Sequence, residues 1–578
     1  MLVLSFKKKL LKKKLLIMKT NFKILVFILL GTFFTQCTSD FDEINVNPSG
    51  FSSDEVSAKF FLTGTQVGLF GPSRFAYWRA NLIHADRYAG HVAFGFSGCW
   101  WSDGLGYSYN SGYTDAAWGM LSGYIGGLEN FQKLVRTGGE FENQYMDAMA
   151  IIMRGVYFQL FTDAFGMVSY SEATNPDIVL PKLDDQNAIY KGVIDELDQA
   201  MATIGDATRT GASVDDAGEN DLYYGGDLQK WKKLANTLKL RIAMRALGAP
   251  GETFAQAAIT SALAAPLMET EAENATLPKD ITISQWNSAS YGDVYYNFGR
   301  GSDWKVGKTL IDKLRNFGDP RLPIFADPAP GGTVLLTQPE GDQAVFHQKR
   351  VDFMKTTLTD AGVDFTETIT DEGTEISFAP DTYYVGQPSR LNGEIIGYSK
   401  FEFWSKPDDY IVGRKNADPL SPEIILTTAE AYFLRAEAAV RGLSSENAQE
   451  MYQEGIRQSM QFWTVSDADI ASFMDNSSMA QLGGSMDEML EKIATQRWIN
   501  AYTDGFEAWS IVRDTGYPSE LAAGVEDFDI FAEGDISGSY PQRLRYGNRL
   551  INTNGANAAS AISIQGPDQQ DTKLWWAK

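Results

Sequence analysis

The feature that most constrains the fold of this chain is a helical spacing of apolar residues that returns several times along the sequence. Within residues 144–161 the apolar side chains recur at steps of three or four, namely Tyr145, Met149, Ile152, Val156 and Leu160. Because an α-helix completes a turn in 3.6 residues, this spacing places them on one face of a helix. Residues 189–204 repeat the pattern after a loop that Pro181 closes. The two segments therefore predict a helix–loop–helix pair.

Three more helix pairs follow the same plan, at residues 228–265, 425–462 and 486–514. Each consists of two segments with helical spacing joined by a short turn, such as the Gly-Ala-Pro-Gly at 248–251. Helix–turn–helix units of roughly 34 residues with small residues at the crossing points resemble tetratricopeptide repeats. The chain is therefore predicted to be mainly α-helical, with tetratricopeptide-like helix pairs.

The composition changes between the second and third pairs. Residues 278–421 are rich in Gly, Pro, Asp, Thr and aromatic residues, and short runs with strand character occur at 333–336, 374–378 and 383–385. We interpret this segment as a large irregular insert with loops and short strands. It belongs to a single domain that covers residues 54–578.

The N-terminus carries a processing signal. Met18, followed by lysines and an apolar run of eleven residues, has the parts of an export signal, and the run is too short to span a membrane. We interpret residues 1–36 as a signal peptide that starts at Met18. Cys37 follows directly, which is typical of lipoproteins acylated at that residue, and the acidic residues 37–53 are then the lipidated tether.

An ordinary signal peptide with an incidental cysteine is the alternative, because Gln36 departs from the small residue that usually precedes a lipidated cysteine.

Removing residues 1–36 takes away eight lysines and no acid, which changes the formal net charge from −24 to −32. Such a charge excludes a nucleic-acid ligand and disfavours direct binding to anionic lipid, so membrane contact is expected through the lipid anchor only. Cys99 is the one other cysteine, so no internal disulfide is predicted.

Residues 94–118 carry eight aromatic residues and five glycines, but no Lys or Arg. Because glycine lets the backbone turn sharply, this composition favours a loop over a helix or strand. Such a loop can offer ring faces and hydrogen-bonding groups to a flat, uncharged ligand such as a sugar. The candidate ligand contacts are Trp100, Trp101, Asp103, Tyr107, Asn110 and Tyr113. The alternative is an irregular aromatic core beneath a long loop.

A second aromatic cluster lies inside the predicted insert. Its candidate ligand contacts are Trp286, Asn287, Tyr291, Tyr296, Arg300 and Trp304. The alternative is that some of these rings, such as Tyr291, Tyr295 and Trp304, pack inward against the helices.

Enzymatic sites find little support in the sequence. The histidines His84, His91 and His347 show no metal-ligand spacing, and no catalytic residue is predicted. Calcium could occupy the acidic segment 215–221, but no EF-hand spacing is present and a solvated loop is the simpler interpretation. No cofactor is therefore expected. A glycoside hydrolase is the strongest enzymatic alternative, because two carboxylates in an aromatic cleft suffice for that reaction.

A series of short motifs resembles the SusD/RagB family of surface lipoproteins. The matching stretches are 162–173 (TDAFGMVSYSEA), 224–227 (YGGD), Trp231, 238–245 (LKLRIAMR), 319–323 (DPRLP), 429–430 (AE), 436–438 (AEA), 496–498 (QRW), 507–509 (EAW), 513–518 (RDTGYP), 541–546 (PQRLRY) and 575–576 (WW). They run through nearly the whole mature chain. Each motif is weak alone, and the ordered series is specific.

The resemblance implies a helical fold of tetratricopeptide-like pairs, no catalysis, and a lipoprotein on the outer membrane that faces the exterior of a Gram-negative bacterium. Members bind oligosaccharide or polysaccharide, or in some cases peptides, and close over a SusC-like TonB-dependent transporter. Glycan contacts in the family lie on loops after the early helices and on the insert, which favours both aromatic clusters. A peptide with charged ends would need Lys or Arg, which residues 94–118 lack.

Overall fold

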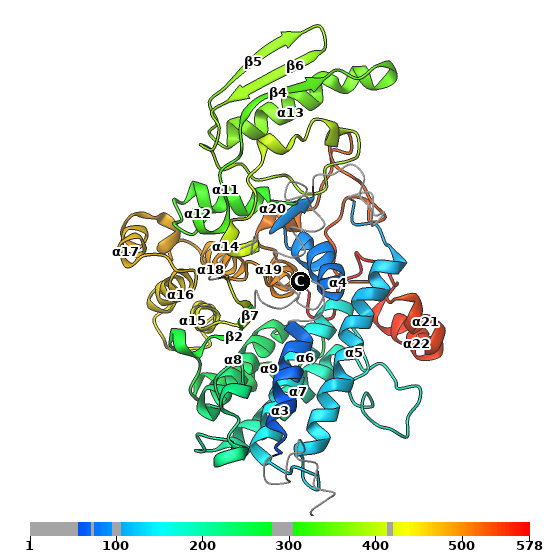
Figure 1. Cartoon of the computed structure of the whole chain (residues 1–578), viewed down its shortest axis with the longest axis vertical. Coiled ribbons are helices and arrows are strands. Elements are labelled where there is room, and N and C mark those ends of the chain that lie inside the picture. Colours follow the sequence, from blue (N-terminus) through cyan, green and yellow to red (C-terminus); the bar gives the residue numbers. More distant parts are fainter. Residues whose placement is uncertain (1–55, 71–73, 95–105, 280–303, 413–419, 578) are drawn as a thin grey trace, which may run out of the picture. The chain divides into compact units, whose positions relative to one another are not determined.

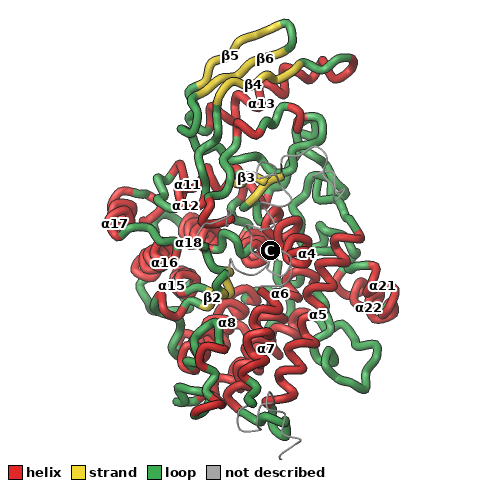
Figure 2. The backbone as a smooth tube through the Cα atoms, in the orientation of Figure 1, coloured by secondary structure: helices red, strands yellow, loops and turns green. Residues whose placement is uncertain are grey.

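The computed structural model describes residues 56–70, 74–94, 106–279, 304–412 and 420–577. The chain divides into two compact units, Met1–Ser57 and Ala58–Lys578, and all the elements below belong to the second. Helices make up most of this unit, and the few strands are short (Figure 2). The mainly α fold class is therefore confirmed.

The first half of the unit is a row of antiparallel helices in which each helix packs against the next (Figure 1). They are α5 (Ser111–Val135), α6 (Gln144–Phe165), α7 (Gln186–Ile204), α8 (Leu228–Ala246) and α9 (Ala255–Leu263). The predicted pairs correspond to α6 with α7 and α8 with α9. Capping residues set their starts: Asn143 accepts hydrogen bonds from the N–H groups of Tyr145 and Met146 at the start of α6.

The second half repeats the arrangement with α15 (Thr428–Val440) and α16 (Ala448–Phe462), followed by α17 (Asp467–Asn476), α18 (Met486–Asn500) and α19 (Gly505–Thr515). The prediction differs at one boundary, because Ile425 belongs to strand β7 (Glu423–Leu426). Thr427 ends that strand and caps α15, since its side chain accepts a hydrogen bond from the N–H of Glu430.

Residues 94–118, predicted as a loop, contain the start of a helix. Asn110 caps α5 by accepting a hydrogen bond from the N–H of Tyr113 at 3.1 Å, and the helix runs on from Ser111. Six of its buried residues recur at steps of three or four, as one face of a helix requires: Ala117, Leu121, Tyr124, Leu128, Phe131 and Val135. This packing face outweighs the glycines that suggested a loop, so the loop prediction is wrong from Ser111 onward.

The predicted insert has its two ends side by side. Strand β2 (Ala275–Leu277) pairs antiparallel with β7, and Leu277 lies opposite Glu423. Within the insert, β4 (Gly332–Thr337), β6 (Gly373–Phe378) and β5 (Phe365–Thr370) form an antiparallel sheet in that order, with α13 (His347–Asp360) beside it (Figure 1). The strand predictions at 333–336 and 374–378 are confirmed, whereas 383–385 forms no strand.

Buried ion pairs join the two halves of the helical scaffold. Arg245 of α8 binds Asp163 of α6 at 2.5 Å and also pairs with Glu507 of α19. Arg241, one turn earlier on α8, donates to Glu430 of α15 at 2.8 Å. Because all these side chains are buried, each charge depends on its partners for compensation. The network holds the scaffold that carries the candidate site.

Candidate functional site

The two aromatic clusters are attached to one short β-ribbon. Strand β1 (Val92–Phe94) pairs antiparallel with β3 (Trp304–Val306), and Phe94 lies directly opposite Trp304. The first cluster begins just after Phe94 and the second ends at Trp304, so both leave the same end of the ribbon. Eight of the predicted contacts lie outside the described residues: Trp100, Trp101, Asp103, Trp286, Asn287, Tyr291, Tyr296 and Arg300.

Trp304 is only 1% exposed, and its ring packs against that of Phe94 with 4.8 Å between the ring centroids. The inward-packing alternative therefore describes Trp304 better than a ring face open to a ligand. Its burial follows from the strand, because all three residues of β3 are buried.

Tyr107 is likewise packed, at 4% exposure. The guanidinium groups of Arg87 and Arg390 lie 4.9 and 4.7 Å from its ring centroid, and its hydroxyl donates to the carbonyl oxygen of Arg87 at 3.2 Å. Cations over the ring hold it by their attraction to the aromatic face. Tyr107 thus differs from the predicted open ring, because its faces are already in contact with the protein.

Asn110 and Tyr113 lie at the start of α5, where both are half-buried. The side-chain oxygen of Asn110 caps the helix, as described above. The ring of Tyr113 meets the edge of Trp78 with 5.6 Å between centroids, beside the guanidinium of Arg79 at 5.7 Å. The structure therefore places Asn110 and Tyr113 next to each other at the start of α5. Trp304 lies elsewhere, in the β1–β3 ribbon.

A cavity of about 320 Å³ opens beside Tyr107. Its aromatic lining is Tyr88, Tyr107, Phe531 and Tyr540, and its polar lining includes Lys308, Ser389 and Glu520. Lys308 lies two residues after the end of β3, so the cavity is close to the ribbon in the chain. Its volume is at the small end of the range for ligand pockets. Of this lining, sequence reasoning named Tyr107 alone. It missed Tyr540 and Phe531 because they come from the C-terminal part of the chain, where no ligand pattern is visible.

Arg390 connects the cavity wall to the first cluster. Its buried guanidinium donates to the carbonyl oxygens of Gly106, at 3.1 Å, and of Gly538, at 2.7 Å. The same group lies over the ring of Tyr107. One side chain therefore fixes the described end of the first aromatic cluster against the C-terminal segment.

Within the described ranges, no group of three or more His, Cys, Asp or Glu side chains is placed to hold a metal ion. Asp221 belongs to the acidic segment 215–221, which was considered above as a calcium site. Its carboxylate accepts hydrogen bonds from Trp231 Nε1 at 2.8 Å and from Gln66 Nε2 at 2.6 Å. Burial lowers the pKa of His91 to about 3, so its imidazole is neutral at physiological pH. No helix among the described residues is long and apolar enough to cross a membrane.

Comparison with known families gives one match that covers most of the chain. The SusD-like family model, described as "Starch-binding associating with outer membrane", matches residues 99–341 and 381–546. The unmatched residues between these two segments hold α13, β5 and β6. The family model therefore does not cover this part of the insert. No curated protein sequence matches the chain.

Several solved structures share the fold. A chitin-binding SusD homolog from Flavobacterium johnsoniae is 19% identical, with a TM-score of 0.69 over 90% of this chain and 98% of that one. A structure described as a chitin-binding protein is 24% identical, with a TM-score of 0.68 over 90% of this chain and 100% of the other. A SusD-like protein from Bacteroides thetaiotaomicron is 23% identical, with a TM-score of 0.66 over 90% and 98%.

Proposed function

Because the chain belongs to the SusD-like family of starch-binding proteins associated with the outer membrane, we propose that it binds an oligosaccharide or polysaccharide at the cell surface. We further propose that it hands this glycan to a SusC-like TonB-dependent transporter. The family is one of binding proteins, so the chain is not an enzyme.

The main structural support for the proposed glycan site is the cross-strand pairing of Phe94 with Trp304. It ties both aromatic clusters to one end of one ribbon, as two sides of a single cleft require. In the proposed site, aromatic rings stack on pyranose faces and polar side chains bond the hydroxyls. The stacking rings are Trp100, Trp101, Trp286, Tyr291 and Tyr296, and the polar groups are Asp103, Asn287 and Arg300.

Several stacked rings are needed for useful affinity. One ring that covers a sugar face hides roughly 40 to 60 Å², which contributes about 1 kcal/mol at about 25 cal/mol per Å². The eight side chains proposed here are enough to engage an oligosaccharide but not to bind a single sugar tightly. The ligand class is therefore a chain of sugars.

The proposed attachment to the membrane is a lipid on Cys37, with residues 37–53 as the tether and the protein facing the cell exterior. The acidic charge of the chain supports this arrangement, because the formal net charge of −32 that remains after removal of residues 1–36 disfavours direct binding to anionic lipid. Labelling with a radioactive fatty acid tests the anchor. We expect the label on the wild type and none on Cys37→Ser.

Affinity electrophoresis in gels that contain starch, chitin fragments or other polysaccharides tests the ligand class. We expect at least one glycan to retard the protein, and the triple variant W100A/W101A/W286A to migrate freely in it. Trp575→Ala, which removes a tryptophan packed against Tyr190 of α7, serves as the control and should be retarded like the wild type. Binding of peptides only, or release of reducing ends from a glycan, would contradict the proposal.

A further inference from the structure

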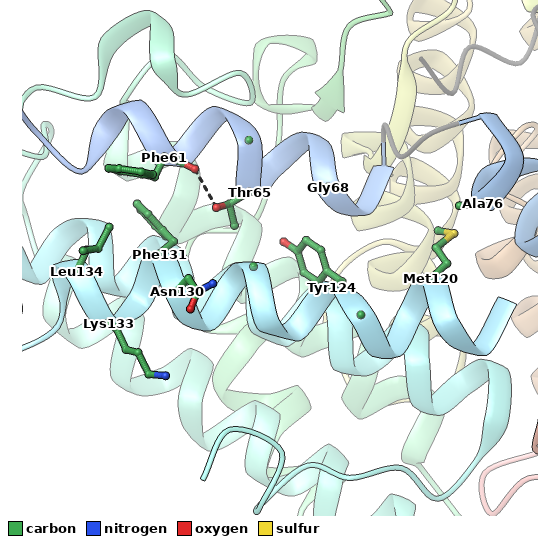
Figure 3. A pocket seen from close by; sticks show the side chains of 13 residues that line it. Phe61, Thr65, Gly68, Ala76, Met120, Tyr124, Asn130, Phe131, Lys133 and Leu134 are labelled. Carbon is green, nitrogen blue, oxygen red and sulfur yellow. Dashed lines mark hydrogen bonds between the residues drawn. The ribbon is translucent and has the colours of Figure 1, made fainter. Parts of the chain in front are cut away.

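Reactive side chains outside the candidate site lie together at one buried point of the helical scaffold. The groove that helix α3 (Lys59–Phe70) forms with α5 encloses about 860 Å³, but it is lined mainly by apolar residues (Figure 3). Its one charged lining residue, Lys133, pairs with Glu129 at 3.7 Å. A lysine and two carboxyl groups, by contrast, meet inside the protein, next to the end of β2 and beside β7.

The pairing of β2 with β7 brings Lys279 and Glu423 together. Leu277 lies opposite Glu423 in this antiparallel ladder, and Lys279 follows two residues later. Because residues two apart along an extended chain point to the same side, the side chain of Lys279 reaches that of Glu423. The Lys279 Nζ lies 3.5 Å from Glu423 Oε1, and the two side chains are only 3% and 8% exposed.

This pair is poorly compensated for a buried ion pair. An ammonium has three protons to donate, yet neither Lys279 Nζ nor Glu423 Oε1 forms a hydrogen bond with a described residue. The hydroxyl of Tyr77 donates to the other oxygen, Glu423 Oε2, at a long 3.4 Å. Taking two charges out of water costs free energy, which only close geometry and further hydrogen bonds offset. The ionic form of this pair is therefore unfavourable.

Asp86 adds a second carboxyl group to the cluster. It is the last residue of the π-helix η1 (Trp78–Asp86) and is fully buried. A Cβ added at Gly505 would come within 2.2 Å of Asp86 Oδ1, so α19 begins in direct contact with this carboxyl. Burial and the charge of Glu423 raise the pKa of the Asp86 carboxyl well above its usual range, while the charge of Lys279 opposes the rise. The site therefore favours a carboxylic acid that can exchange protons with its neighbours.

We propose that Lys279 and Glu423 are joined by an amide bond between their side chains, a covalent modification that goes beyond the proposed function. The ammonium of Lys279 passes a proton to the carboxylate, and the neutral amine then attacks Cδ of Glu423. A Nζ–Cδ bond forms and a Cδ–O bond breaks. The oxygen leaves as water with two of the three ammonium protons, and the third stays on the amide nitrogen. Asp86 accepts and returns a proton during the transfer and ends unchanged, so no other reactant is needed.

The amide removes both buried charges and leaves a carbonyl oxygen to which the hydroxyl of Tyr77 donates. It also joins two positions that are 144 residues apart and bracket the insert. A cross-link stabilises a protein mainly by constraining its unfolded chain, and more so for a longer loop. Because no internal disulfide is predicted, this bond is a covalent clamp of another kind. Lys279 lies seven residues before Trp286, so the clamp anchors the start of the second aromatic cluster.

Peptide mapping of the full-length protein tests the bond directly. Trypsin does not cleave after a lysine whose Nζ carries an amide, so cleavage after Lys279 should be lost. We expect a branched product in which residues 246–300 are joined to residues 416–435, lighter than the two peptides together by one water molecule. Its fragmentation should place the link between Lys279 and Glu423. Separate peptides 246–279, 280–300 and 416–435 from the wild type would overturn the proposal.

Three variants separate the bond from an ordinary ion pair. Lys279→Arg keeps the charge but forms no amide, so the branched product should disappear. Asp86→Asn loses the proton carrier and should lower the linked fraction at least about tenfold. The matched control is Lys239→Arg, because Lys239 donates to Asp198 Oδ1 at 2.6 Å in an ordinary pair whose carboxylate is 47% exposed. This control should keep the branched product in full.

Full linkage in Asp86→Asn would overturn the role of Asp86, and loss of the product in Lys239→Arg would overturn the assignment to Lys279. The wild-type map decides whether the bond exists, so a variant that fails to fold does not leave the question open. Glycan binding is no part of the measurement. The amide and the proposed function therefore stand or fall separately.

Discussion

Phe94 and Trp304, 210 positions apart in the sequence, are cross-strand partners whose ring centroids are 4.8 Å apart. Each sits at the edge of an aromatic cluster that the sequence marks as a ligand contact. Their pairing makes the β1–β3 ribbon the common base of both clusters. The position of the proposed cleft therefore depends on a buried contact that itself touches no ligand.

Trp304→Ala should weaken both the fold and glycan binding. Removing a buried tryptophan costs roughly 3–5 kcal/mol of unfolding free energy, because the vacated space is only partly refilled. Trp304→Phe keeps a ring against Phe94, so we expect it to retain glycan affinity within about threefold. Denaturation curves and affinity electrophoresis measure the two effects. If Trp304→Phe loses affinity while remaining stable, Trp304 contacts the ligand directly.

The helix pairs were predictable because each carries a long apolar face, and α16 ends at Phe462, where the spacing places the end of the pair at 425–462. Helix α5 was missed because its glycines resemble those of a loop. Six of its buried residues, spaced at three or four from Ala117 to Val135, and the cap Asn110 were visible signals of a helix.

The site was harder to predict than the fold. Composition shows that Tyr107 and Trp304 lie among aromatic residues, but it does not show that Arg390, nearly 300 positions away, covers the ring of Tyr107. Contacts of this kind depend on how distant segments meet. The β1–β3 pairing was hidden for the same reason, since each strand is only three residues long.

Asn110→Ala should destabilise the protein by about 1 kcal/mol, since the cap of α5 loses its acceptor for the N–H of Tyr113. Asn110→Ser supplies another oxygen and should restore most of that loss. Urea denaturation measures the difference. Equal destabilisation by both substitutions would show that Asn110 acts through some contact other than the cap.

Arg390→Lys should reduce glycan affinity more than it reduces stability. Lysine keeps the charge but cannot reproduce a planar group that donates to Gly106 and Gly538 at once. The end of the first aromatic cluster would then be held less firmly. Calorimetric titration and thermal melting separate the two quantities. An unchanged affinity in Arg390→Lys would contradict this positioning role.

Stability should depend on pH through Asp504, which caps α19. Burial raises its pKa to about 8, and the neighbouring charge of Glu507 adds to the rise, while Arg241 opposes it. A carboxyl with a pKa near 4 when unfolded and near 8 when folded binds its proton more tightly in the folded state. This group therefore lowers stability progressively as the pH rises from about 4 to 8.

Asp504→Asn has no proton to lose and keeps an oxygen for the N–H of Glu507, which lies 3.3 Å from the Asp504 carboxylate. We expect the Tm of this variant to exceed that of the wild type by more at pH 9 than at pH 5. Asp467→Asn, at an exposed position in α17, is the control and should show the same difference at both values. A constant gap for Asp504→Asn would exclude the proposed titration.

Calorimetric titration of the mature chain with an oligosaccharide of its preferred glycan tests the central claim most directly. The claim is that both aromatic clusters form one glycan site above the Phe94–Trp304 ribbon. Trp101→Ala and Trp286→Ala should each weaken binding about fivefold or more, near 1 kcal/mol per lost ring, and the double variant should show no measurable heat of binding. Wild-type affinity in the double variant would contradict the account.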